Sequence, residues 1–279
     1  MRVKNVKIKK HALEKKYGTV VFLDYINHVK PENLNFIPVY FNDELKIKDC
    51  KQLTRKLMRK DILTTENDCI ELTKKGISFI HRNEVYLKFF YLGSPYISLI
   101  EFEEMQKQNR AEQNSFEMTV ISILFKKLGH YVKREESSHV IGIASTIGDM
   151  YEREGDREQA LEYYLMALYY QVAGIEFYDN FKKLNDGKLT EEVMKKSYRW
   201  TFVSHELLDN LKNYKDIKYD AMVSRIYDNR MTHIRLFSRG EFMNLVASIM
   251  NGEFNSAEFN KKRKKYYLEL IIQTLKNKN

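Results

Sequence analysis

The chain has 279 residues, of which 43% are hydrophobic and 30% charged, with only three prolines and eleven glycines. This length fits one or two globular domains, and the scarcity of helix-breaking residues favours long helices over a turn-rich β-sandwich. No apolar stretch is long enough to span a membrane. The charged N-terminus lacks the apolar run and cleavage site of a signal peptide, so we expect a cytoplasmic protein.

Positive charge is concentrated at the N-terminus. Residues 1–60 hold fifteen Lys or Arg and six Asp or Glu, a net charge of +9, which equals the formal charge of the whole chain. A basic N-terminal region joined to a neutral body favours an anionic partner, with DNA or another nucleic acid first. The alternative is that these lysines only keep the surface soluble.

The first clear element is an amphipathic helix, or a pair of short helices, over residues 43–60. Leu45, Cys50, Leu53 and Leu57 recur at helical spacing. The opposite face is basic, and we expect its side chains to contact phosphates: Lys51, Arg55, Lys56, Arg59 and Lys60. Upstream of this helix, residues 17–25 fit either a helix or a strand.

A short hairpin and another helix follow. Residues 62–64 and 69–72 are strand-like runs on either side of a polar turn, and Thr73 is placed to cap a helix that contains Ile77 and Phe79. Helix, hairpin and the sequence LTKKG resemble the C-terminal half of a winged-helix DNA-binding domain over about forty residues. A SAP-like helix-extended-helix unit would give a similar pattern and the same class of partner.

The segment 84–102 is rich in aromatic residues and is broken at Gly93-Ser94-Pro95. We place the domain boundary at this break, which gives a basic domain over residues 1–92 and a helical domain over residues 96–279. Rings at residues 89–91 could stack on bases, but such a run is more typical of a seal between packed parts of a protein.

Helices are predicted almost throughout the rest of the chain. Their expected ranges are 115–132, 137–154, 156–174, 200–211, 220–231, 240–251 and 257–275, with a turn at 185–187 and a helix cap at Thr190. Phe242, Leu245, Ile249, Leu268 and Ile271 fit either the core or a homo-dimer interface, and we favour the core.

Residues 147–167 carry the most specific pattern in the chain. Small residues at Gly148, Ala160 and Ala167 would let two antiparallel helices approach, Tyr151 and Tyr164 would fill the groove, and Gly155-Asp156 would form the turn. This spacing resembles a tetratricopeptide repeat, a helical hairpin of about 34 residues. One hairpin cannot bury its apolar face alone, so the resemblance implies a solenoid of three or four stacked helix pairs.

Tetratricopeptide-like solenoids bind partners on the concave face formed by the first helix of each pair. The resemblance therefore implies that a protein or peptide partner contacts Ser145, Asp149 and Glu152, which lie on the first helix and are not needed for packing.

No catalytic motif of similar quality is present, and we expect the chain not to be an enzyme. Phosphate-binding, dinucleotide-binding and nucleophile-elbow signatures are absent, and His205-Glu206 lacks the second histidine of a zinc protease. Arg199 with His205, and Arg134 with His139, have the spacing of pairs in HEPN-type ribonucleases, but such pairs arise by chance in a basic chain. Cys50 and Cys69 form no metal-binding motif, so neither a metal nor another cofactor is expected.

The predicted fold is therefore mainly α, with a small α+β winged-helix-like domain followed by a tetratricopeptide-like solenoid. This order of modules resembles regulators of low-GC Gram-positive bacteria and their phages, in which a DNA-binding head precedes a body that senses a peptide or protein, and prophage proteins of the same layout. The alternatives are a protein-binding adaptor or inhibitor without DNA binding and, third, a HEPN-like ribonuclease.

Overall fold

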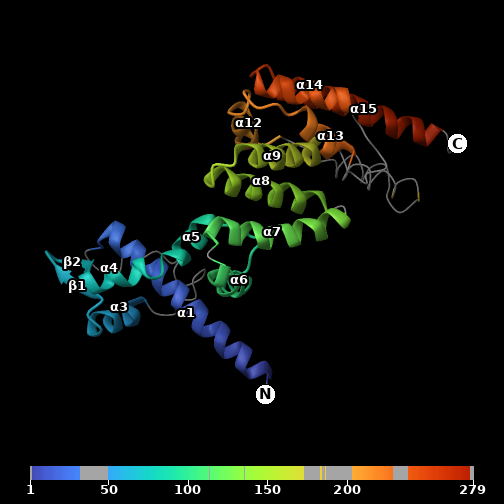
Figure 1. Ribbon diagram of the computed structural model, residues 1–279. Coiled ribbons are helices and arrows are strands. Elements are labelled where there is room, and N and C mark those ends of the chain that lie inside the picture. Colours follow the sequence, from blue (N-terminus) through green and yellow to red (C-terminus); the bar gives the residue numbers. More distant parts are fainter. Residues whose placement is uncertain are drawn as a thin grey trace. The chain divides into compact units, whose positions relative to one another are not determined.

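The computed structural model confirms a mainly helical chain with one two-stranded sheet (Figure 1). It describes residues 2–31, 50–112, 114–134, 136–172, 183, 186, 203–228 and 238–276. The chain forms two compact units, Met1–Phe116 and Glu117–Asn279. Of the predicted features, Pro38, residues 43–49, Asn185, Gly187 and the cap at Thr190 lie outside the described residues.

The N-terminal unit contains the sheet and five helices within its described part, together with the first residue of a sixth helix. In chain order these elements are α1 (Arg2–Val29), α3 (Cys50–Arg59), β1 (Leu63–Glu66), β2 (Cys69–Leu72), α4 (Lys74–His81), α5 (Glu84–Leu92) and α6 (Leu99–Glu112), and Phe116 begins α7 (Phe116–Lys133).

Helix α1 supplies the centre of the N-terminal core, and it resolves the ambiguity of residues 17–25 in favour of helix. Val20, Phe22, Leu23 and Ile26 are all fully buried, because α1 contacts β2 on one side and α4, α5 and α6 on others. Such all-round burial explains why the segment has no amphipathic pattern that distinguishes helix from strand.

The β1–β2 hairpin has the register Leu63↔Leu72 to Glu66↔Cys69, which leaves a two-residue turn. Asn67 and Asp68 form this turn with φ values of 49° and 62°. Two successive positive φ values match the right-handed twist of paired strands, and Asn and Asp are the non-glycine residues that adopt them most readily. The predicted hairpin is thus confirmed, with its turn at residues 67–68.

Helix α4 begins as predicted at a Thr73 cap. The Thr73 hydroxyl accepts a hydrogen bond from the Gly76 amide at 3.1 Å and donates to the Asp61 carbonyl at 2.7 Å. Thr73 N–H also donates to the Ile62 carbonyl. A Cβ on Gly76 would lie 2.3 Å from that same carbonyl oxygen, so the close approach of α4 to residue 62 requires glycine.

The aromatic rings of α5 pack inside the N-terminal unit. Tyr17 of α1 contacts Tyr86 and Phe89, and Phe89 stacks on Phe102 of α6 with ring centroids 4.5 Å apart. The Tyr86 hydroxyl donates a hydrogen bond to Glu103 at 2.8 Å. These contacts keep α6 in the N-terminal unit, so the compact units divide after Phe116, later in the chain than the predicted break at residues 93–95.

All the regular secondary structure in the described part of the C-terminal unit is helical. It comprises α7 after its first residue, α8 (Ser137–Arg153), α9 (Arg157–Val172), α12 (His205–Lys212), α13 (Asp220–Asp228), α14 (Arg239–Met250) and α15 (Ser256–Lys276).

Helices α8 and α9 form the predicted antiparallel hairpin, with Gly155 at φ 82° in the turn. Their contact is close because Gly148 has no side chain, since a Cβ there would lie 2.6 Å from Cε1 of Tyr164. Tyr164, Ala160 and Ala167 are fully buried in the hairpin, as the spacing of small and aromatic residues predicts.

Helix α9 connects this hairpin to the rest of the unit, because it contacts α12 and α13 as well as α8. Helices α12 and α13 in turn contact α14. Phe242 and Ile249 of α14 are fully buried, and Leu245 and Ile271 are almost so. These four residues therefore lie in the core of the single chain, as the sequence analysis favours over a dimer interface.

Candidate functional site

The basic face predicted for residues 51–60 lies on α3, whose opposite face anchors it to the N-terminal core. Thr54 and Leu57 are buried, and the Thr54 hydroxyl donates to the Cys50 carbonyl at 2.8 Å. The side chains predicted to contact nucleic acid are all exposed: Lys51, Arg55, Lys56, Arg59 and Lys60. None of them forms an ion pair with another described residue.

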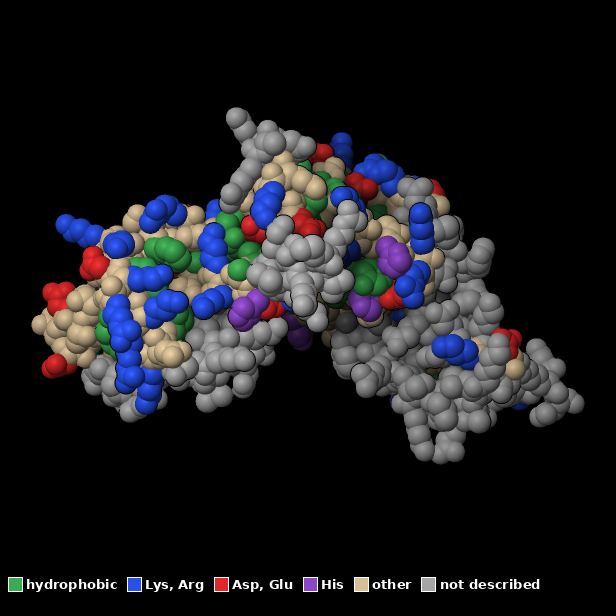
Figure 2. All heavy atoms as spheres, turned by 90° about the horizontal axis from the view of Figure 1, so that it is seen from below, with side chains coloured by type: hydrophobic (Ala, Val, Ile, Leu, Met, Phe, Trp, Pro, Cys, Tyr) green, Lys and Arg blue, Asp and Glu red, His purple; other side chains and the backbone are tan. Residues whose placement is uncertain are grey.

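Two further lysines, Lys74 and Lys75, extend this basic face onto the first turn of α4. Both are exposed, and Lys75 Nζ donates a hydrogen bond to the Lys60 carbonyl at 2.8 Å. Figure 2 shows Lys and Arg side chains gathered at the end of the N-terminal unit that carries α3 and the hairpin. Both lysines belong to the LTKKG sequence that carries the winged-helix resemblance, although the phosphate contacts predicted from the sequence do not include them.

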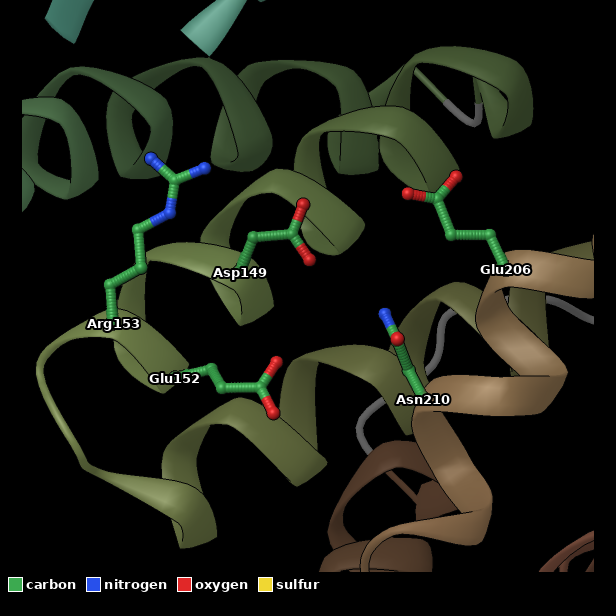
Figure 3. Close-up of a pocket in the computed structure, with 5 residues that line it drawn as sticks. All are labelled: Asp149, Glu152, Arg153, Glu206 and Asn210. Carbon is green, nitrogen blue, oxygen red and sulfur yellow. The ribbon is translucent and has the colours of Figure 1, made fainter. Parts of the chain in front are cut away.

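A second candidate site is a pocket of about 400 Å³ in the C-terminal unit. Asp149, Glu152 and Arg153 line it from the end of α8, and Glu206 and Asn210 line it from α12 (Figure 3). Three carboxylates and one guanidinium give the lining a net negative charge. The pocket is therefore suited to a cationic group and unfavourable for an anion.

Tyr164 of α9 holds two of these carboxylates in place. Its hydroxyl lies 2.7 Å from Asp149 Oδ1 and 3.0 Å from Glu152 Oε2. Burial raises the pKa of Tyr164 well above its usual range, and the two carboxylates raise it further. The phenol consequently stays protonated and acts as a donor at all physiological pH values.

The Asp149 carboxyl is destabilised in its ionised form. Burial is the main cause and raises its pKa above 3.8, and the negative charges of Glu206 and Glu152 also raise it, while the Tyr164 hydrogen bond and Arg153 lower it. A carboxyl with a raised pKa stabilises the fold when protonated, and this contribution is lost as the pH rises through the folded-state pKa. Ionised Asp149 thus weakens the fold at neutral pH, and a bound cation would offset that effect.

Tyr214, which follows α12, lies fully buried beneath the same carboxylates. Its ring packs edge-to-face on Tyr164, with centroids 5.8 Å apart. Burial raises the pKa of its hydroxyl, and the nearby Glu152 carboxylate raises it further.

Ion pairs from α9 fix the chain that follows α12. Arg157 makes a bidentate contact with Asp216 at 2.8 and 2.9 Å, donates to the Asn213 carbonyl, and places its Cζ 5.4 Å from the centroid of the Tyr214 ring. These contacts hold the chain after α12 against α9, which in turn packs on α8.

The structure brings together two of the three predicted partner-binding residues. Asp149 and Glu152 line the pocket. Ser145 lies nearer the N-terminus of α8, is half-buried and does not line the pocket. Glu206 and Asn210 were not predicted, because they lie far along the chain from Asp149. Glu206 belongs to the His205-Glu206 pair, and in the sequence this pair is similar only to a fragment of a zinc-protease motif.

Of the two Arg–His pairs in the ribonuclease alternative, the structure describes one completely and only the histidine of the other. Arg134 Nε lies 2.8 Å from Glu136 and His139 Nδ1 lies 3.4 Å from the same carboxylate, so an acidic group occupies the space between the two basic residues. The His139 ring also stacks on Tyr131. Arg199 lies outside the described residues, and His205 is an exposed residue at the start of α12.

Within the described part of the chain, no group of three His, Cys, Asp or Glu side chains is arranged to hold a metal ion. Cys50 and Cys69 are half-buried and form no disulfide with each other. None of the helices described here combines the length and apolar character needed to cross a membrane.

Comparison of the chain with protein-family models, with curated proteins and with solved structures gives no match. The two candidate sites are therefore interpreted from the chemistry of their own residues.

Proposed function

We propose that the chain is a regulatory binding protein without catalytic activity, which binds nucleic acid through the basic face of α3 and a protein or peptide partner through the α8–α12 pocket. The nucleic-acid half rests on a single observation. Four exposed cations on α3 and a fifth, Lys60, directly after it form no ion pair with a described residue. Such a surface is of the kind that binds phosphates and releases counterions.

The order of elements supports a winged-helix-like head. Helix α3, the β1–β2 hairpin and α4 follow one another as in the C-terminal half of such a domain, and α1 provides a preceding helix against which β2 and α4 pack. In this arrangement α3 would present its basic face to DNA. The α8–α9 hairpin, with Gly148 against Tyr164, similarly supports a tetratricopeptide-like body.

The partner half of the proposal rests on where the pocket lies. In a tetratricopeptide-like hairpin the first helix faces the partner, and the pocket opens on α8, the first helix of this hairpin. Asp149 and Glu152 are the contacts that both the repeat pattern and the pocket lining favour.

Binding to a fluorescent random-sequence DNA duplex at low salt, measured by anisotropy, tests the nucleic-acid half. The test variant changes Lys51, Arg55 and Lys56 to Glu, and a matched control changes Lys126, Lys215 and Lys218, which are exposed lysines of the C-terminal unit. We expect the first variant to lose binding and the control to retain most of it, although both undergo the same change in net charge. Equal loss in both would indicate attraction by net charge alone.

One observation favours the alternative of a protein-binding adaptor without DNA binding. The strand end and turn of the hairpin carry Glu66 and Asp68, both exposed, and these carboxylates would repel phosphates that approached the hairpin. An adaptor would bind no duplex at any salt concentration.

A further inference from the structure

Helix α4 carries a second exposed basic face in the N-terminal unit. Lys74 and Lys75 in its first turn, His81 in its last turn and Arg82 at its C-cap are all exposed. Neither the helix nor its C-cap residue contains a carboxylate. This face of the helix is therefore entirely cationic or uncharged.

The acidic residues that flank α4 in the sequence lie close to cations outside the helix. Glu71 Oε1 lies 3.0 Å from Lys30 Nζ, and Glu84 Oε1 lies 3.9 Å from Lys88 Nζ. Their negative charge is thus directed at Lys30 and Lys88, and the basic residues of α4 keep a positive surface.

The start of α4 is held against the chain that directly follows α3. The Thr73 hydroxyl donates a hydrogen bond to the Asp61 carbonyl at 2.7 Å, and the Thr73 amide donates to the Ile62 carbonyl at 3.1 Å. Lys75 Nζ donates to the Lys60 carbonyl at 2.8 Å. Because these hydrogen bonds end on backbone carbonyls, the basic residues of α4 continue from Lys60 in one fixed surface, and α4 itself extends it by about 12 Å.

The two lysines at the start of α4 are unfavourable for the helix itself. Lys74 and Lys75 lie at the positive end of the helix macrodipole, where acidic side chains stabilise a helix and basic side chains destabilise it. The Lys75 hydrogen bond also brings its ammonium group beside Lys60, where like charges repel. Helix stability therefore does not explain these residues, whereas a bound polyanion would offset both effects.

The β1–β2 hairpin, the other element that follows α3, is less suited to phosphates than α4. Residues 63–72 contain three carboxylates and no Lys or Arg, and Glu66 and Asp68 are exposed at the tip. Phosphates would be repelled by the hairpin tip and attracted by the face of α4. Of these two elements, α4 is the one that fits a polyanion running on from α3.

We infer that α4 is a second nucleic-acid contact of the N-terminal unit, in which Lys74, Lys75 and Arg82 bind phosphates of the same duplex that α3 engages. This inference rests on the proposed function, since it extends the same interface. Contacts to phosphates fix how a protein is oriented on a duplex, so α4 sets the direction in which the duplex leaves α3. The acidic hairpin tip stays outside the contact.

The test measures binding of the full-length protein to the fluorescent duplex at low salt by anisotropy. Changing Lys74, Lys75 and Arg82 to Gln should weaken binding about tenfold or more, because three phosphate contacts are lost. The matched control changes Lys126, Lys215 and Lys218 to Gln, which removes the same charge from exposed sites of the C-terminal unit. The control should bind within about twofold of the wild type, since salt screens distant exposed charges.

Two further measurements separate a lost contact from a lost fold. The α4 variant should unfold at a urea midpoint close to that of the wild type, because the three side chains are exposed. In the wild-type protein, bound duplex should protect Lys74 and Lys75 from chemical acetylation, read by mass spectrometry, while Lys215 and Lys218 react as they do without duplex.

Wild-type affinity in the α4 variant, equal weakening in the variant and its control, or unchanged acetylation of Lys74 and Lys75 would each overturn the inference. If the variant with Glu at positions 51, 55 and 56 lost binding in the same experiment, the proposed function would stand without α4. Failure of the wild-type protein to bind duplex would overturn both.

Discussion

Replacing Gly148 by Ala tests whether the close contact of α8 and α9 stabilises the C-terminal unit. The new Cβ would lie 2.6 and 2.8 Å from two carbons of the Tyr164 ring, closer than non-bonded carbons approach. That ring is fully buried, and its hydroxyl shares one proton between Asp149 and Glu152 at 2.7 and 3.0 Å, so it cannot move aside freely. Overpacking of this kind costs about 1–3 kcal/mol, and the better helix propensity of Ala offsets about 0.8 kcal/mol of it.

The expected net loss for Gly148→Ala is roughly 0.2–2.2 kcal/mol, and its upper end corresponds to a decrease of about 4–9 °C in the Tm of a domain of this size. Gly129 in α7 is the matched control, because a Cβ there would meet no atom within 4 Å. Gly129→Ala should therefore raise the Tm by about 2–3 °C through helix propensity alone. Thermal melts followed by far-UV circular dichroism measure both. A Gly148→Ala protein as stable as the wild type would refute the packing of the hairpin described here.

Three further predictions concern the N-terminal unit and the pocket. Thr73→Ala should destabilise the N-terminal unit by about 1 kcal/mol, since it removes the helix cap of α4, and urea unfolding of the variant measures the loss. Gly76→Ala should destabilise the same unit more strongly, because the new Cβ would collide with the backbone at Ile62. An unchanged urea midpoint for this variant would contradict the close approach of α4 to residue 62. Tyr164→Phe should raise the pKa of Asp149 further, since a hydrogen bond to the ionised carboxylate is lost; an unchanged or lowered NMR titration midpoint would show that the hydrogen bond does not form.

The sequence was informative where structure depends on local spacing. Gly148 and Tyr164 lie at the separation of packed positions on two short helices, and Thr73 directly precedes the helix that it caps, so both features could be predicted. The extent of the N-terminal unit could not, because it depends on contacts of Phe89 with Phe102 and of Tyr86 with Glu103. Such contacts have no periodic signature.

The candidate sites likewise combine features that local spacing predicts with features that depend on tertiary contacts. The basic face of α3 follows from the helical spacing of residues 51–60, and Asp149 and Glu152 follow from the hairpin pattern. Glu206 reaches the pocket only because α12 packs on α9, a tertiary contact with no trace in local sequence. The role of Tyr164 was predicted as packing alone, since its hydroxyl contacts depend on the relative rotation of α8 and α9.

The salt dependence of duplex binding tests the nucleic-acid half of the proposal most directly. Each phosphate neutralised contributes about −0.9 to the slope of log K against log salt concentration. Contacts from the four cations of α3 and from Lys60 directly after it would therefore give a slope of about −4.5. Neutralising Lys51, Arg55 and Lys56 by substitution with Gln should reduce its magnitude to about 1.8. A slope near zero in the wild-type protein, or equal slopes for both proteins, would contradict binding of nucleic acid through α3.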